Sequence, residues 1–252
     1  MNVFMLGTGS AFAKANYNNN ALFTTGGQTL LVDCGITAPR ALHDLGRTFN
    51  EIDAVLITHI HADHIGGLEE FAFQMKFIYG RKPRLYIADT LADTLWESSL
   101  KGGLYQDENP TLSSYFDVHP IAEGTDVEVL PGLRIKLLAT KHIPNKPNYS
   151  LIVNDRFFYS GDTVFDQDLL LSLVEEQRIG LIFHDCQLHP PGVVHASLSQ
   201  LLTLPPSVQR LTHLMHYGDD HPEFVGRTGL MQFVEQHVNY QIDPVTFELK
   251  RL

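Results

Sequence analysis

The chain has 252 residues, of which 44% are hydrophobic and 19% charged, as in an ordinary globular protein and unlike a disordered one. No apolar run approaches the roughly 20 residues that a membrane helix needs. The formal net charge is −11, from 18 basic and 29 acidic residues, which argues against a long nucleic acid as partner because such polyanions are held through Lys and Arg. The two cysteines indicate no disulfide framework, and the N-terminus has no signal-peptide pattern, so we expect a cytosolic protein.

The first half of the sequence alternates predicted strands and helices. Apolar or β-rich runs predict strands over residues 2–6, 21–25, 28–33 and 53–58, and from Pro83 onward. Helices are predicted over residues 38–46, 65–79 and 90–100, followed by a loop over 101–117 that is rich in Gly, Asp, Asn, Pro and Ser.

The second half repeats this order, from hairpins to strand–helix units. Strands are predicted over residues 126–130, 133–140, 149–153, 156–160, 180–184, 210–215 and, at the tail, 244–250. Helices are predicted over residues 165–177, 196–204 and 222–238. Two such halves predict two sheets packed together with helices outside, in one domain that spans residues 1–252.

The most informative segment is THIHADH, residues 58–64, which directly follows the buried strand. Residues two apart in an extended chain point the same way, so His59 and His61 can face one metal ion. Asp63 and His64 follow where the chain turns into the next helix, and they can bind at a neighbouring point. Imidazole and carboxylate ligands suit zinc first, with manganese, iron or nickel as alternatives. The competing interpretation is a solvated polar turn at a strand end.

This HxHxDH pattern resembles that of the metallo-β-lactamase-fold hydrolases, and the resemblance covers nearly the whole chain. It implies an α+β fold, the αββα sandwich, with a two-metal site at one edge of the sheets. One metal would be held by His59, His61 and a later histidine. The other would be held by Asp63, His64 and a last histidine, with a later aspartate bridging the two. The resemblance thus implies two Zn²⁺ per chain, and Asp63 could also accept the proton of the attacking water.

The later positions of the pattern can be matched after predicted strands. His142 matches the third histidine, Asp162 the bridging aspartate and His216 the last histidine. The alternative for His142 is an exposed loop histidine beside a lysine. His213 competes with His216, but it lies inside an apolar run and is expected in the core or behind the ligands. Asp33 matches a buried aspartate that orients the metal-site loop without binding the metal.

The N-terminal FMLGTGSAF, followed by LLVDCG, is similar to the phosphodiesterase branch that includes tRNase Z. In that branch a histidine protonates the leaving oxygen and an acidic residue orients the histidine. His195 and Asp185 stand at the matching positions, with Asp185 replacing a glutamate and so having a shorter reach. The alternative for His195 is a structural position near the cap of the helix that starts after Ser197.

The chain departs from tRNase Z between His142 and Asp162, where a short hairpin replaces the arm that grips tRNA. The tract FHDCQLHPPGVVHASL, followed by THLMHYGDD, resembles the anti-Pycsar phosphodiesterases of phages and bacteria. That resemblance implies a homodimer that hydrolyses 3′,5′-cyclic mononucleotides, cyclic CMP and cyclic UMP included, in the cytosol of a bacterium or a phage-infected host. The expected partner is therefore a small cyclic nucleotide, with neither long nucleic acid nor membrane.

Base recognition needs a few donors, acceptors and aromatic faces. Tyr105 in the loop 101–117, and Asn148 and Tyr149 in the stretch 145–149, are the candidates, with plain surface loops as the alternative. Other functions stay open: hydrolysis of a lactone, thioester or β-lactam, a tRNase Z-like RNA endonuclease, and a metal- or nucleotide-binding module. The pair of His195 and Asp185 argues against acyl hydrolysis, which has less need of a second acid.

Overall fold

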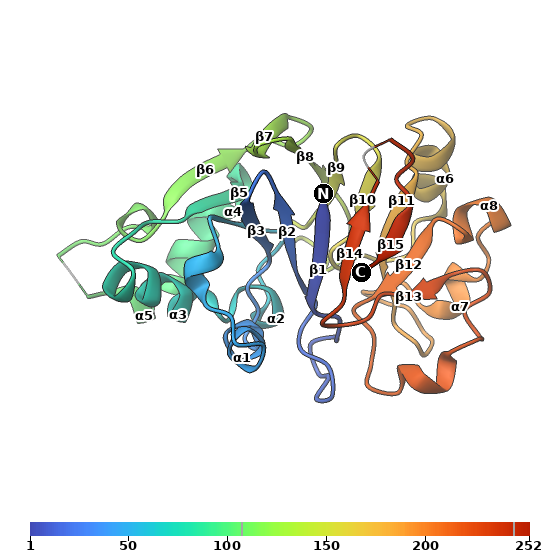
Figure 1. The fold of residues 1–252 in the computed structure, drawn as a ribbon, viewed down its shortest axis with the longest axis horizontal. Coiled ribbons are helices and arrows are strands. Elements are labelled where there is room, and N and C mark those ends of the chain that lie inside the picture. The colour runs from blue at the N-terminus through green and yellow to red at the C-terminus, as the bar shows by residue number, and fades with distance from the viewer. Residues whose placement is uncertain (107, 244) are drawn as a thin grey trace.

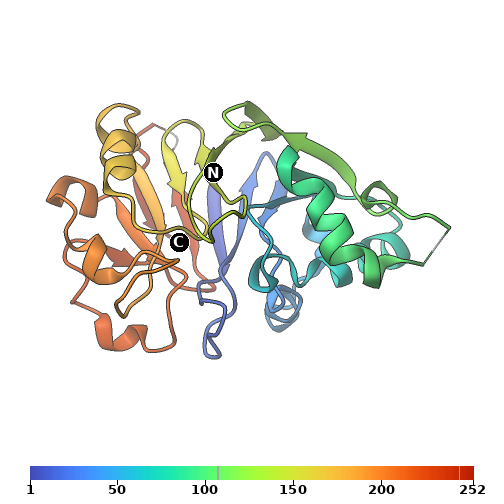
Figure 2. The same cartoon turned by 180° about the vertical axis from the view of Figure 1, so that it is seen from behind.

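The structure is a computed structural model that describes residues 1–106, 108–243 and 245–252, and two mixed β-sheets form its centre. Figure 1 shows the N-terminal half, in blue and green, beside the C-terminal half, in yellow to red, and Figure 2 gives the view from behind. No described helix combines the length and the apolar character needed to cross a bilayer.

The first sheet has the strand order β15-β14-β1-β2-β3-β4-β5-β6. Its strands are β1 (Asn2–Gly7), β2 (Asn20–Thr25), β3 (Gln28–Val32), β4 (Ala54–Ile57), β5 (Arg84–Ala88), β6 (Asp117–Ile121), β14 (Asn239–Ile242) and β15 (Leu249–Arg251). The strands β2 and β3 form the predicted antiparallel hairpin across Gly26-Gly27, and β3 to β6 run parallel.

The second sheet has the strand order β13-β12-β11-β10-β9-β8-β7. Its strands are β7 (Asp126–Leu130), β8 (Leu133–Ala139), β9 (Tyr149–Val153), β10 (Phe157–Tyr159), β11 (Leu181–Asp185), β12 (Thr212–Met215) and β13 (Gln232–Phe233). The strands β10 to β13 run parallel, so their carboxyl ends meet at one edge of the sheet.

Helices cover the outer faces of both sheets. They are α1 (Ala38–Asp44), α2 (Ala62–Ile65), α3 (Leu68–Phe73), α4 (Asp89–Leu95), α5 (Lys101–Leu104), α6 (Gln167–Glu175), α7 (Leu198–Leu201) and α8 (Pro206–Gln209). Between the sheets, the ring of Phe23 on β2 lies 6.0 Å from Phe157 and 5.8 Å from Tyr159 on β10. On the outer side, Leu173 of α6 and Val208 of α8 are buried with Ile182 of β11. The predicted arrangement, two packed sheets with helices outside, is confirmed.

The predicted helix over residues 222–238 is wrong. Residues 221–224 form one 3₁₀ turn, after which Gly226 and Gly229 adopt positive φ angles and turn the chain. The chain then forms β13, which pairs with β12, and its residues His237 and Val238 exchange backbone hydrogen bonds with Met5 of β1 just before β14 begins. Pairing with a distant strand therefore overrides the local helical pattern.

Three further boundaries differ from the prediction. The segment 101–117 is not a continuous loop: residues 101–104 are helical and β6 begins at Asp117, paired in parallel with β5. Asp107, within that segment, lies outside the described residues, as does Pro244 of the predicted tail strand. The predicted helix 65–79 begins already at Ala62, so Asp63 lies in the first turn of α2.

Candidate active site

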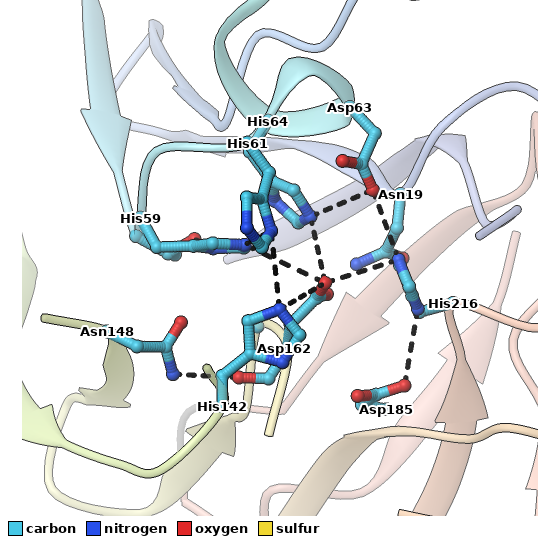
Figure 3. Close-up of polar contacts among 12 residues, drawn as sticks. Asn19, His59, His61, Asp63, His64, His142, Asn148, Asp162, Asp185 and His216 are labelled. Atoms are coloured by element: carbon cyan, nitrogen blue, oxygen red, sulfur yellow. Dashed lines mark hydrogen bonds and ion pairs between the residues drawn. The ribbon is translucent and has the colours of Figure 1, made fainter. Parts of the chain in front are cut away.

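Four chain segments, each of which directly follows a strand, meet at one edge of the sandwich. Residues 59–64 follow β4, His142 follows β8, Asp162 follows β10 and His216 follows β12. Figure 3 shows these side chains pointing toward one another, with Asp162 between the imidazoles. The fold therefore brings together all seven residues that the sequence proposes as metal ligands.

The ligand atoms form two clusters that share Asp162. In each cluster the potential ligand atoms lie within 4.8 Å of one another. One cluster contains His59, His61, His142 and Asp162, and the other contains Asp63, His64, His216 and Asp162. Their side chains are buried except that of His61, which is partly exposed. Such a shared carboxylate is the arrangement that would bridge two ions.

In the first cluster, the spacing of the donor atoms fits metal coordination. His59 Nε2 lies 3.0 Å from His61 Nδ1, and His142 Nε2 lies 3.3 Å from the same nitrogen. Two ligands bound to zinc at ~2.0–2.1 Å with tetrahedral angles lie about 3.4 Å apart. The three imidazoles therefore already stand at ligand separation.

The second cluster has the same spacing. Asp63 Oδ2 lies 3.2 Å from His64 Nε2 and 3.3 Å from His216 Nε2, and these two nitrogens lie 3.3 and 3.4 Å from Asp162 Oδ2. Within the described part of the chain, His64 Nε2 and both oxygens of Asp162 are buried and have no hydrogen-bond partner. Buried polar atoms without partners are costly unless something satisfies them, and a divalent cation would do so.

Asp33 lies behind the second cluster and orients it. Its carboxylate accepts hydrogen bonds from the backbone N–H of Thr58 at 2.9 Å and from the Thr58 hydroxyl at 2.8 Å. It also lies 2.7 Å from Nδ1 of His64, which leaves Nε2 of His64 facing the cluster. Burial acts to lower the pKa of His64, but the surrounding carboxylates raise it well above its ordinary value. The predicted role of Asp33, orienting rather than binding, agrees with these contacts.

Two other candidate ligands, His142 and His59, also have polar partners that orient their rings. Nδ1 of His142 lies 2.6 Å from the carbonyl oxygen of Val194, and Nδ1 of His59 lies 3.1 Å from the Thr58 hydroxyl. His216 adopts a φ of 58°, a left-handed conformation that is strained for a residue with a side chain. This sharp turn directs His216 into the site, whereas His213, three residues earlier, stays in β12 beside Phe183.

His195 and Asp185 form a pair beside the clusters. His195 Nδ1 lies 2.7 Å from Asp185 Oδ2, and Asp185 is fully buried while the His195 side chain is 21% exposed. The 2.7 Å distance is that of a charge-assisted hydrogen bond and is shorter than the separation of two ligands on one metal. Burial acts to lower the pKa of His195, but Asp185 raises it above its ordinary value. His195 is thus held where its charged, proton-donating form is favoured.

Asp185 has two further contacts. The same oxygen accepts a hydrogen bond from the backbone N–H of Thr163 at 3.0 Å, and its other oxygen lies 3.3 Å from Nδ1 of His216. One buried carboxylate therefore positions both His195 and the last histidine of the second cluster. The shorter reach of Asp compared with Glu is no obstacle, because Asp185 ends β11 directly beneath both rings.

The three residues predicted to contact the base lie in different surroundings. Tyr105 is 53% exposed and lines a separate surface cavity that holds none of the ligand residues. Tyr149 is buried, with its hydroxyl 2.8 Å from that of Thr90. Asn148 is buried and donates a hydrogen bond to the carbonyl oxygen of Asp162 at 2.8 Å, which supports the bridging residue.

Sequence reasoning missed the asparagines at the start of β2. Asn20 accepts a hydrogen bond from the N–H of Gly35 at 3.0 Å and donates to the carbonyl oxygen of Asp63 at 3.3 Å, so it joins the Asp33 loop to α2. The close approach requires glycine at position 35, because a Cβ there would overlap the Asp63 carbonyl. The run Asn18-Asn19-Asn20 was the available signal, since three buried asparagines in a row need partners.

Two cavities are lined by residues of the clusters. The first, the His61 cavity, has a volume of about 480 Å³, and its lining includes His59, His61 and Lys146. The second, the His195 cavity, has a volume of about 370 Å³, and its lining includes Phe12, Leu188, Val194, His195 and His216. Both volumes lie in the range of small-molecule sites.

The fold and the clustered ligands define a metallo-β-lactamase-fold protein, as the sequence predicts. The metallo-β-lactamase-fold protein YhfI from Bacillus subtilis has a TM-score of 0.72 at 18% identity, covering 94% of this chain and 98% of that one. A diphosphatase of the PhnP family has a TM-score of 0.75 at 18% identity, covering 99% of both chains. The short form of human tRNase Z has a TM-score of 0.68 at 18% identity, covering 96% of this chain and 100% of that one. At this identity the likeness establishes the fold alone.

Sequence comparison identifies the family. Residues 1–240 match the family model described as anti-Pycsar protein Apyc1. The chain is 61% identical to the Apyc1 of Paenibacillus harenae, over 96% of this chain and 100% of the relative. It is 44% identical to the Apyc1 of Bacillus phage BSP38, over 94% of this chain and 96% of the relative. The chain therefore belongs to the anti-Pycsar protein Apyc1 family, and the predicted resemblance is confirmed.

Proposed function

We propose that this protein is a metal-dependent phosphodiesterase that hydrolyses 3′,5′-cyclic mononucleotides, cyclic CMP and cyclic UMP included, to nucleoside 5′-monophosphates. The observation that carries the proposal is the hydrogen-bonded pair of Asp185 and His195, placed beside two ligand clusters that share Asp162. Family membership supports it, because the relatives are named anti-Pycsar proteins and the sequence resemblance to that family implies action on cyclic nucleotides. The biological role would be to remove such a signal.

The metal content that fits the site is two Zn²⁺ per chain, with Mn²⁺, Ni²⁺ or Fe as alternatives, since both clusters offer imidazole and carboxylate donors. The first ion would be held by His59, His61 and His142, and the second by Asp63, His64 and His216, with Asp162 bridging them. When bound, such ions lower the pKa of a coordinated water and neutralise charge on the phosphoryl oxygens.

Asp63 and His195 would move the protons. Burial acts to raise the pKa of Asp63, but the neighbouring histidines hold it well below the ordinary value, so the carboxylate is ionised. From its place in the second cluster, Asp63 would accept the proton of the attacking water. His195 would donate a proton to the departing 3′ oxygen of the ribose. With Nδ1 bonded to Asp185, the proton to be transferred is the one on Nε2. General acid catalysis of this kind contributes about 10²- to 10⁴-fold in rate.

The small size of the substrate follows from the connection between His142 and Asp162. That connection consists of the β9–β10 hairpin and its flanking turns, so no arm extends from it to grip tRNA. The net charge of −11 is also unfavourable for a long polyanion. A single phosphate can still be held, because bound cations reverse the sign of the local field.

One preparation should be assayed on cyclic CMP, cyclic UMP, cyclic AMP and a 3′-extended tRNA, alongside nitrocefin and simple lactones. We expect hydrolysis of the cyclic mononucleotides and little processing of the tRNA. Preference for the tRNA would overturn the proposal, and inertness toward every cyclic mononucleotide would favour the lactone or thioester alternative. No turnover of any substrate by metal-replete protein would favour a binding module. The homodimer, the single domain over residues 1–252 and the cytosolic location stay predictions.

A further inference from the structure

Phe12 is an aromatic side chain exposed at the mouth of the candidate active site. It lies in the connection between β1 and β2, the blue loop in Figure 1, and 88% of its surface is exposed. Its ring lines the His195 cavity, together with His195 and His216. Exposing a whole phenyl ring is unfavourable, and at a cavity mouth it suggests a ligand that covers the ring.

The backbone that carries Phe12 is fixed, so the ring is not on a free loop. The carboxylate of Asp219 accepts hydrogen bonds from the N–H groups of Lys14 at 2.6 Å, Ala15 at 2.9 Å and Asn16 at 3.2 Å. On the other side of Phe12, the N–H of Ser10 donates to the carbonyl oxygen of Tyr217 at 3.0 Å. Both anchors belong to the segment that follows His216. The position of Phe12 is thereby tied to that of a candidate metal ligand.

The position of the proton donor indicates which cavity the nucleoside would occupy. His195 lines the His195 cavity, whereas His59 and His61 line the His61 cavity. A proton donor must contact the leaving oxygen, and in a 3′,5′-cyclic diester that oxygen is part of the ribose. With the phosphate at the clusters, the ribose and its base would therefore extend into the His195 cavity, toward Phe12.

We propose that Phe12 is a substrate-binding residue whose ring stacks on the nucleobase of a cyclic mononucleotide held in the His195 cavity. This proposal rests on the proposed function and adds to it the place of the base. Leu188 and Val194 supply apolar surface deeper in the same cavity. Stacking tolerates every base, because each base has a π-face, and so it binds the nucleoside without reading the edge of the base.

The test compares Phe12→Ala with the wild type on two diesters that differ only in the base. The first is cyclic CMP, and the second is 1-deoxyribose 3′,5′-cyclic phosphate, which lacks a base. For cyclic CMP we expect KM to rise about 10-fold with little change in kcat, since base–aromatic stacking is sensitive to alanine substitution to that extent. For the base-free diester we expect no change. Phe12→Tyr should restore the wild-type KM.

The control variant is Phe77→Ala, which removes another exposed ring, 61% exposed, from a segment away from both cavities. It should leave both substrates unaffected, and thermal unfolding should show that Phe12→Ala is as stable as the wild type. An unchanged KM for cyclic CMP in Phe12→Ala, or an equal rise on the base-free diester, would overturn the stacking role. Failure of the wild type to hydrolyse any cyclic mononucleotide would instead overturn the proposed function.

Discussion

The two halves of the molecule build the site in different ways. The N-terminal half contributes His59, His61, Asp63 and His64 from one continuous segment that runs from the end of β4 into α2. The C-terminal half contributes single residues from separate strand ends, such as Asp162 after β10 and His216 after β12. In the first half local chain geometry sets the spacing of the ligands, and in the second half the parallel register of the strands sets it.

The halves also differ in the chemistry that they offer. The polar residues of the N-terminal segment either line the two clusters or, like Asp33, support a residue that does. The C-terminal half contains in addition the pair of Asp185 and His195, whose 2.7 Å separation marks a hydrogen bond rather than shared coordination. Variants of the candidate ligands in either half should therefore lose metal and activity together, whereas at His195, which only the second half supplies, the two effects should separate.

The largest effect is expected for Asp162→Ala. Asp162 is the one residue common to both clusters, and its loss leaves buried imidazoles without their shared carboxylate. Turnover should fall to background, and elemental analysis should show less metal than the two ions per chain proposed for the wild type. The matched control is Asp155→Ala, an aspartate 68% exposed in the β9–β10 turn, which should retain both. Full activity in Asp162→Ala would refute the two-metal site.

His195→Ala should separate activity from metal content. We expect a loss of about 10²- to 10⁴-fold on ribose diesters with near-normal metal content, because His195 is proposed as a proton donor. The loss should be smaller on bis-p-nitrophenyl phosphate, whose leaving group needs less protonation. His119→Ala, at a partly exposed histidine on β6, serves as the control. Equal losses on both diesters would show that His195 is not the general acid.

The same difference between the halves explains what the sequence could predict. The HxHxDH segment is visible in the sequence because its residues are neighbours, and the buried strands before it have a clear apolar pattern. His142, Asp162 and His216 carry no local signal of comparable strength. They could be assigned only through the family resemblance, which supplies the order in which they occur along the chain.

The parts of the fold and site that the sequence did not predict depend on tertiary contacts. Residues 232–238 were taken for part of a helix because their pairing partners, β12 and Met5 of β1, are distant in the chain. Asn148 and Tyr149 have the residue types of base contacts and stay predictions: Asn148 lines the His61 cavity but donates to the Asp162 carbonyl, and the Tyr149 hydroxyl lies beside that of Thr90. Which polar group a buried side chain meets depends on strand register, and residue type alone does not contain that information.

A smaller effect is expected for Asp33→Asn, behind the N-terminal segment. The variant loses the charge that faces His64 and one of the oxygens that accept from Thr58. Metal affinity should fall about 10- to 100-fold, the usual cost of altering a group that orients a metal ligand. Titration of metal-free protein would measure it, and excess metal should restore turnover. Excess metal should not restore His195→Ala, so rescue of both variants would remove the distinction between the halves.

The smallest effect concerns His213, the histidine of β12 that stays in the sheet. Burial lowers its pKa to about 4, below the ordinary value near 6.5, so the folded protein holds it neutral where the unfolded chain would protonate it. Its contribution to stability is therefore complete above pH 6.5 and is lost as the pH falls toward 4. Between these limits the free energy of unfolding should fall by about 2–3 kcal/mol on account of this residue.

His213→Gln, which keeps a polar side chain but does not titrate, should remove that part of the pH dependence. Denaturant unfolding of both proteins at pH 7.5 and pH 4.5 would measure the difference, with the wild type losing more stability on acidification. The other titratable groups are the same in both proteins, so their contributions cancel in the comparison. An identical loss in the two proteins would mean that β12 tolerates a protonated His213. Burial in the sheet would then not explain why His216, rather than His213, belongs to the site.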